Sequence, residues 1–186
     1  MNKIETQLRT LLMAEMSKRN TLLVAQWIGA DIERFDMLMK LVSLNEEPIA
    51  RRAAWVATVE LPLRSELIQP HLPQIVQELP LYKHTGTLRC MLKVISEIDF
   101  PTFLDGELVN LCFDWVENAQ MPLAIRALSM EILYRISIRE PDLKQELLVL
   151  FRNLAEISLD PAILSKSRLI IARIEKLEQK RRTQYL

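Results

Sequence analysis

The segment from Pro48 to Leu61, PIARRAAWVATVEL, contains the pattern that decides the fold. Its proline stands where a helix can begin, because the first N–H groups of a helix have no intrahelical partner. Small apolar residues, mostly alanines, then recur on one face. Trp55 falls nearly opposite them, next to Arg51 and within reach of Arg52. The spacing predicts an amphipathic helix with one face of small side chains.

The second arginine of this segment returns at a fixed interval along the chain. Arg52 is followed 37 residues later by Arg89, in GTLRCMLKVISEI, and after 37 more by Arg126, in PLAIRALSMEILYRI. Each of the three precedes a small residue. A fourth segment, from Pro161, keeps the proline but not the arginine spacing. Repetition at such a period is the signature of stacked repeat units.

A second helical element alternates with the first. Pro62, Pro101 and Pro141 each stand ahead of it, and a Glu-Leu pair recurs inside it. Two helices in a unit of roughly 37–41 residues match the period of HEAT-type helical arrays. We therefore predict an all-α fold, a HEAT-like α-α superhelix of about five antiparallel helix pairs.

The whole chain is predicted to form a single helical-repeat domain. That domain is residues 1–186, with repeat units over 31–61, 62–98, 101–139 and 141–180 and an N-terminal helix pair over 4–29. Asn20 or Thr21 is expected to cap the second helix, and Asp31 the third. Pro70 and Pro73 interrupt a helical pattern, so a kink or a split is expected there.

Composition and charge exclude several classes of protein. Lysine plus arginine equals aspartate plus glutamate, at 24 each, so the chain lacks the basic surplus of nucleic-acid binders. Three glycines leave no room for a glycine-rich phosphate loop. No apolar run approaches the roughly 20 residues of a membrane span, and charges interrupt any N-terminal signal sequence. Two cysteines indicate a reduced setting, so we expect a cytoplasmic protein without a cofactor.

Two segments carry a family resemblance. The string ARRAAWV, with CFDWVENAQMPLAIRALSMEILY further on, resembles a group of small bacterial HEAT-like proteins over most of the chain. This resemblance implies a helical-repeat fold of the armadillo type. Some of those proteins carry the name adenylosuccinate lyase, whose superfamily uses a glycine-rich, serine-containing loop. The glycines here, Gly29, Gly86 and Gly106, are scattered, so the resemblance implies a fold and not a reaction.

Arginines and a tryptophan form the first candidate binding site. Arg51, Arg52 and Trp55 lie close together on the predicted helix, and Arg89 and Arg126 are expected to continue the line along the array. Two interpretations of the tryptophan remain open. It belongs to the core between stacked helices, or it forms an open patch with the arginines for a planar or anionic ligand.

The role of the arginine line also has two open interpretations, a structural one and a ligand-binding one. Nearby acids such as Glu46 and Glu60 neutralise it internally, or it recognises a carboxylate or phosphate. HEAT-like alkylpurine DNA glycosylases use tryptophans, arginines and an aspartate on their concave face. A DNA-repair-like glycosylase, or another small enzyme on this scaffold, is therefore the alternative function.

An acidic stretch between residues 94 and 125 forms the second candidate site. It contains six carboxylates and no Lys, Arg or His. Glu107, Asp114 and Glu117 share one face of a predicted helix, opposite an apolar face that includes Trp115, which we expect in the core. The acidic face is either a solvated outer surface or a docking surface for a basic partner.

The segment from Pro161 onward is the basic counterpart of that stretch. It has seven lysines and arginines against two glutamates. A capping helix whose basic end suits the helix macrodipole explains this charge, and contact with an anion is the alternative.

No residue pattern points to catalysis or to a metal. Cys90 and Cys112 have no histidine near them, so a thiolate nucleophile or a zinc site has no support. His71 and His84 are expected at the surface or as helix caps. The predicted function is a non-enzymatic scaffold that binds a protein or peptide, with no catalytic residue, no metal, and neither nucleic acid nor membrane as partner.

Overall fold

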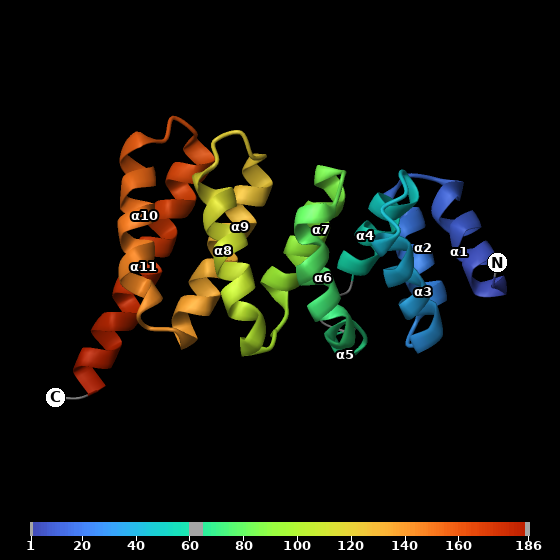
Figure 1. The fold of residues 1–186 in the computed structure, drawn as a ribbon, viewed down its shortest axis with the longest axis horizontal. Helices are drawn as coiled ribbons and strands as arrows, with labels where there is room; N and C mark the ends of the chain where they lie inside the picture. The colour runs from blue at the N-terminus through green and yellow to red at the C-terminus, as the bar shows by residue number, and fades with distance from the viewer. Residues whose placement is uncertain (1, 60–64, 185–186) are drawn as a thin grey trace. The chain divides into compact units, whose positions relative to one another are not determined.

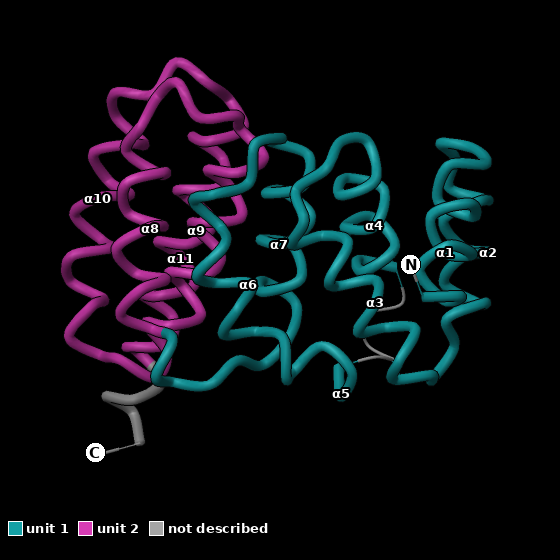
Figure 2. Tube along the Cα trace, turned by 45° about the vertical axis from the view of Figure 1, so that its right-hand side comes forward, with its two compact units in different colours: residues 1–104 teal, residues 105–186 magenta. Residues whose placement is uncertain are grey.

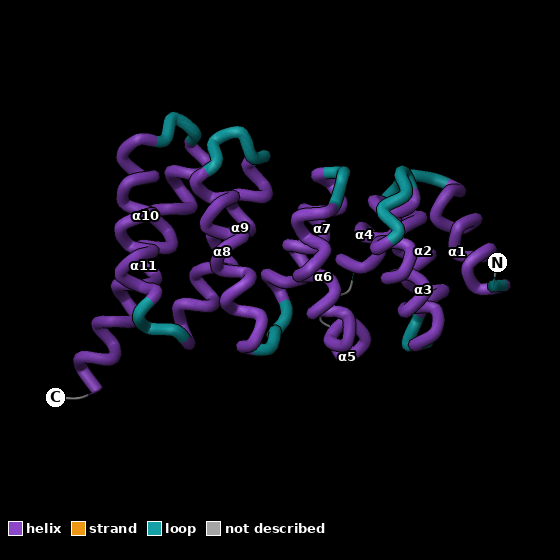
Figure 3. Tube along the Cα trace, in the orientation of Figure 1, coloured by secondary structure: helices purple, strands orange, loops and turns teal. Residues whose placement is uncertain are grey.

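A computed structural model describes residues 2–59 and 65–184, with side chains as far as residue 179. These ranges contain helices, turns and loops and no strand (Figure 3), which confirms the all-α prediction. The α-helices are α1 Lys3–Ala14, α2 Lys18–Ile28, α3 Ile32–Ser43, α4 Ile49–Thr58, α5 Ser65–Ile68, α6 Leu72–Glu78, α7 Thr85–Glu97, α8 Asp105–Glu117, α9 Leu123–Arg139, α10 Leu143–Ile157 and α11 Pro161–Gln184. Short 3-10 turns are η2 Gln69–His71, η3 Leu79–Leu81 and η4 Thr102–Leu104.

The chain forms two compact units, residues 1–104 and 105–186 (Figure 2). In the first unit α1 packs against α2, α3 against α4, and α4 also against α7. In the second unit α8 packs against α9, α10 against α11, and α9 also against α11. Short loops join the partners of each pair, which makes them antiparallel (Figure 1). The boundaries of the individual repeat units stay a prediction.

Small side chains place helix α4 at the centre of the first unit. Ala50, Ala53, Ala54 and Ala57 are all buried, as the sequence pattern predicts. Helix packing distances depend on the size of the side chains at the contact, so alanines let neighbouring backbones approach closely. Accordingly α4 contacts α1, α2, α3 and α7.

Prolines mark helix boundaries as expected. Pro48 stands at the N-cap of α4, and Pro161 is the first residue of α11. Around Pro70 and Pro73 the chain divides into α5, the turn η2 and α6, so the predicted split is confirmed. Pro62 lies outside the described residues.

The start of α2 differs from the prediction. Ser17 is the N-cap instead of Asn20 or Thr21, and its hydroxyl accepts a hydrogen bond from the Asn20 N–H at 3.1 Å. The Asn20 side chain instead donates to the carbonyls of Leu11 and Glu15, each at 2.9 Å. Helix α1 ends at Ala14, because the backbone of Glu15 is already extended, and Ser17 then begins the next helix.

Candidate binding sites

A small cavity lies in the first unit where α4 and α7 pack together. Helix α4 contributes Arg51, Arg52 and Trp55, and α7 contributes Arg89. Four of the predicted site residues therefore meet at one place, around a volume of about 170 Å³. The remaining lining residues are Met16, Gly86 and Cys90.

Trp55 is only partly buried, and it forms one wall of this arginine cavity. The fully buried positions of α4 are taken instead by Val56 and the alanines. Of the two interpretations of Trp55, the geometry therefore favours the patch shared with the arginines over a place in the core. That the patch binds a ligand stays a prediction.

Arg51 reaches three partners, none of them at short range. Its Nε lies 3.7 Å from a carboxylate oxygen of Glu47, and its Nη1 lies 3.3 Å from Nε2 of His84. Its Nη2 is 3.9 Å from the sulfur of Met16. Gly86 makes room for this side chain, because a Cβ at position 86 would lie 3.1 Å from the Arg51 Cδ.

Arg52 and Arg126, which the repeat places at equivalent positions, have the same kind of partner. Arg52 Nη1 donates to the Leu12 carbonyl at 2.9 Å, in the last turn of α1. Arg126 Nε donates to the Val116 carbonyl at 3.0 Å, in the last turn of α8. Arg34 makes a similar bond to a carbonyl in the last turn of α2. Last-turn carbonyls lack an intrahelical donor and form the negative end of the helix dipole, so these arginines act as cross-helix caps.

The arginines differ in their exposure. Arg126 is buried, with 6 % of its surface exposed, whereas Arg89 is exposed. Arg126 belongs to the second unit, and its alignment with the arginines of the first unit stays a prediction. Glu46, one of the acids considered for neutralising the line, pairs with Arg9 at 3.0 Å, while its neighbour Glu47 lies 3.7 Å from Arg51. Glu60 lies outside the described residues.

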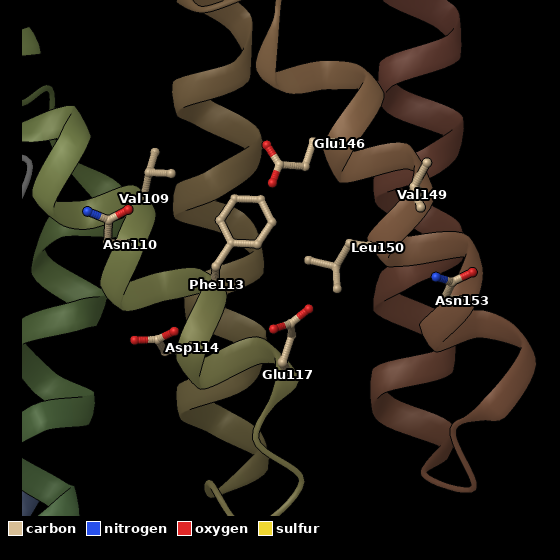
Figure 4. A pocket seen from close by; sticks show the side chains of 9 residues that line it. All are labelled: Val109, Asn110, Phe113, Asp114, Glu117, Glu146, Val149, Leu150 and Asn153. Atoms are coloured by element: carbon tan, nitrogen blue, oxygen red, sulfur yellow. The ribbon is translucent and has the colours of Figure 1, made fainter.

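In the second unit, α8 and α10 border an open groove of about 840 Å³ (Figure 4). Phe113 of α8 and Leu150 of α10 point toward one another across it. The carboxylates of Glu117 and Glu146 lie on either side of this apolar pair. The acid-rimmed groove, as we call it, has the nine lining residues Val109, Asn110, Phe113, Asp114, Glu117, Glu146, Val149, Leu150 and Asn153.

The predicted acidic face supplies part of this groove. Asp114 and Glu117 line it, while Glu107 is exposed on the same helix but outside the lining. The sequence reasoning missed the apolar floor around Phe113 and everything contributed by α10. Only the structure reveals this floor, where Val149, an aliphatic side chain of the amphipathic α10, is 60 % exposed.

Trp115 is not enclosed in the core as predicted. Leu108, Cys112 and Val116 fill the buried face of α8, and Trp115 lies beside that face, partly exposed. A residue one position before the centre of the apolar stripe points toward its edge, since successive helical residues are about 100° apart.

Part of the positive charge of α11 is paired with a carboxylate of the second unit. Lys166 and Arg173 both hydrogen-bond the carboxylate of Glu131 on α9, the latter at 2.9 Å. Burial alone would raise the pKa of Glu131, but the two cations outweigh it and lower the pKa below its ordinary value. The side chains from residue 180 onward lie outside the described part of the chain.

Neither cysteine has thiolate character. Burial raises the pKa of the Cys90 thiol, although Arg89 and Lys93 act in the opposite direction. Burial also raises the pKa of Cys112, to about 12. Both thiols are therefore protonated near neutral pH and are poor nucleophiles and poor metal ligands.

The histidines serve local structure. His84 Nδ1 accepts a hydrogen bond from the Gly86 N–H at 2.9 Å, so the predicted capping role is confirmed for it. His71 Nε2 lies 2.9 Å from a carboxylate oxygen of Asp36. Among the described residues no group of three or more His, Cys, Asp or Glu is placed to hold a metal ion. In the same ranges, no helix has the length and apolar character needed to span a bilayer.

Antiparallel helix pairs that stack on their neighbours define a helical-repeat protein. More specifically, the chain belongs to the HEAT repeat domain family, which matches residues 8–174. The HEAT-like fold expected from the sequence is thereby confirmed. No curated protein and no solved structure matches the chain.

Proposed function

We propose that the protein is a non-enzymatic, cytoplasmic scaffold module that binds a protein or peptide in the acid-rimmed groove. HEAT repeats form helical scaffolds whose extended surfaces commonly bind other proteins. The observation that carries the proposal is the apolar pair Phe113 and Leu150, which lines the groove between the carboxylates of Glu117 and Glu146. Both side chains are partly exposed, and Val149 beside them is 60 % exposed. Exposed apolar surface rimmed by polar residues is typical of interaction sites.

The chemistry of the groove favours a basic amphipathic helix as the partner. Helix-in-groove recognition inserts apolar anchors from one face of the helix into an apolar floor. Three carboxylates, from Asp114, Glu117 and Glu146, surround the floor, and no Lys, Arg or His is among the described residues that line it. Lysines and arginines flanking the anchors would meet complementary charge, which raises the association rate and excludes acidic partners.

A helical peptide with leucines on one face and Lys or Arg on the other is a direct probe of the groove. Titrated by fluorescence anisotropy, it should bind the protein saturably. Glu117→Lys should weaken binding by about tenfold, because an attraction becomes a repulsion. Phe113→Ala should weaken it by a similar or larger factor, because apolar anchors dominate such interfaces.

Glu156→Lys is the matched control for charge. Glu156 is exposed on α10 and lies outside the groove lining, so this variant changes the net charge by the same amount. Its affinity for the peptide should equal that of the wild type. An equal loss in Glu117→Lys and Glu156→Lys, or equal binding of an acidic peptide of the same pattern, would contradict the groove as the binding site.

Two enzymatic alternatives are expected to fail. Adenylosuccinate cleavage needs a glycine-rich loop that the sequence lacks, so the resemblance to bacterial proteins of that name should not extend to turnover. A DNA glycosylase would be retained on DNA in a salt-dependent way, whereas a chain of zero formal net charge should pass through at low salt. Turnover or DNA retention that survives clean purification would contradict the non-enzymatic function.

A further inference from the structure

The arginine cavity of the first unit is chemically the opposite of the acid-rimmed groove. Three of its seven lining residues, Arg51, Arg52 and Arg89, are cations, and none is an acid. The rest of the lining is apolar or neutral, and the neutral members include the protonated thiol of Cys90. All seven residues lie within residues 1–104, so a ligand here does not depend on the groove in the second unit.

Few carboxylates lie close enough to neutralise these arginines in the described part of the chain. Glu47 approaches Arg51 at 3.7 Å, which is too long for a strong hydrogen bond. Arg52 is held by a backbone carbonyl and has no described carboxylate within salt-bridge range. Arg89 is exposed and has no acidic partner among the described residues, so the positive charge of the cavity is accessible to solvent.

Two guanidinium donors at this place have no hydrogen-bond partner. The Nε atoms of Arg51 and Arg52 are buried without an acceptor, and both residues line the cavity. Buried unpaired donors are rare in folded proteins and cost about 1–3 kcal/mol each. Because both atoms are closed to solvent, an anion in the cavity would satisfy them only if the side chains turned their Nε–H groups toward it, which would recover this free energy.

A third donor, Nη1 of Arg51, faces His84 without forming a good hydrogen bond to it. His84 Nδ1 accepts from the Gly86 N–H, so in the neutral ring the hydrogen is on Nε2. That Nε2 lies 3.3 Å from Nη1 of Arg51, which is also a donor. Because two donors cannot bond each other, this part of the Arg51 guanidinium gains nothing from His84 and stays available to an anion.

The size and walls of the cavity restrict the ligand further. Its volume of about 170 Å³ is below the roughly 300–1,000 Å³ of sites for larger ligands. A cavity of about 150 Å³ accepts a benzene ring, so a single ring fits here. Trp55, Met16 and Cys90 supply the apolar walls for such a ring, and a planar guanidinium fork matches a carboxylate.

We propose that the arginine cavity binds a small aromatic monocarboxylate, with its ring against Trp55 and its carboxylate among Arg51, Arg52 and Arg89. The ring excludes water from the apolar wall, and the carboxylate accepts from guanidinium donors that the fold leaves unpaired. Arg89, as the exposed member, attracts the anion from solvent.

Benzoate is the probe, and NMR of the arginine Nε–H and tryptophan indole N–H signals is the readout. Titration should shift the Trp55 indole signal and Nε–H signals of Arg51 and Arg52 saturably, with an affinity that calorimetry confirms. Benzamide, which has the same ring without the charge, and inorganic phosphate, which has charge without a ring, should each bind at least about tenfold more weakly.

The variant Arg89→Gln should weaken benzoate binding by about tenfold without changing the fold, because Arg89 is exposed and caps no helix. Lys93→Gln is the matched control, since Lys93 is exposed one turn further along α7 and does not line the cavity. The control should bind benzoate like the wild type. No saturable shift with benzoate, equal binding of benzamide or phosphate, or an equal loss in both variants would overturn the proposal.

Discussion

Arg126 in the second unit and Arg52 in the first occupy equivalent repeat positions but differ in how fully their guanidinium groups are used. Both donate to a carbonyl in the last turn of a neighbouring helix. Arg126 is buried by the packing around α9, whereas Arg52 borders a cavity and leaves its Nε without an acceptor. These two arginines therefore share the same kind of first partner, whereas Arg89, at the third equivalent position, is exposed and makes no such bond among the described residues. The surrounding side chains decide whether donors remain for a ligand.

The largest effect is expected from Arg126→Met. This change removes a buried, charge-assisted hydrogen bond and leaves the Val116 carbonyl without its donor. The free energy of unfolding should fall by about 2–3 kcal/mol, as for hydrogen bonds to charged groups. Urea denaturation monitored by circular dichroism at 222 nm measures it. A loss below about 1 kcal/mol would show that Arg126 is not the structural member of the pair.

Arg52→Met should cost less, about 1 kcal/mol, because the lost bond to Leu12 is only partly buried and an unpaired buried donor disappears with it. The same urea measurement applies. Arg89→Met serves as the control for an exposed arginine and should stay within about 0.5 kcal/mol of the wild type. Equal losses for Arg52→Met and Arg126→Met would remove the distinction between the two positions.

The smallest effect is expected in the pH dependence of stability, and it comes from the carboxylate of Glu131, which pairs with two cations in the second unit. Lys166 and Arg173 lower the pKa of Glu131 in the folded protein, so its ion pairs stabilise the fold above the unfolded pKa, ordinarily 4.5. This stability is lost as the pH falls through the lower folded pKa. Below about pH 4.5, the urea midpoint of the wild type should therefore fall more steeply than that of Glu131→Gln.

Parallel pH curves for the wild type and Glu131→Gln would show that Glu131 is not a stabilising partner of α11. The cavity arginines provide an internal reference, because they have no comparable carboxylate partner in the described residues. The Arg52→Met variant should accordingly keep the acid dependence of the wild type.

The helical architecture was readable from the sequence because its signals are local. Pro48 and Pro161 mark helix starts whatever surrounds them, since the restriction lies in the proline ring. The burial of the α4 alanines was predictable, because a helix face of small side chains lets a neighbouring helix pack closely against it. The cluster of Arg51, Arg52 and Trp55 was likewise visible within one helix.

The groove was not readable in the same way, because it is made by two helices far apart in sequence. Phe113 on α8 and Leu150 on α10 become one surface only when the helices are placed side by side. The burial of Arg126 and the exposure of Arg89 also escaped prediction. A 37-residue spacing gives both arginines the same position in the repeat, but the surrounding side chains cover only Arg126.

The cross-helix caps make each helix pair depend on its neighbour, so a single pair is harder to move to another protein than the repeating sequence suggests. Arg52 on α4 closes the end of α1, and Arg34 on α3 closes the end of α2, so the N-terminal pair is finished by residues of the following pair. Excising α1 and α2 would strip both arginines of their acceptors. Grafting that pair onto another array would leave both carbonyls without these donors unless the recipient brought an arginine to each. The smallest piece of the first unit that keeps both caps is therefore two helix pairs and not one.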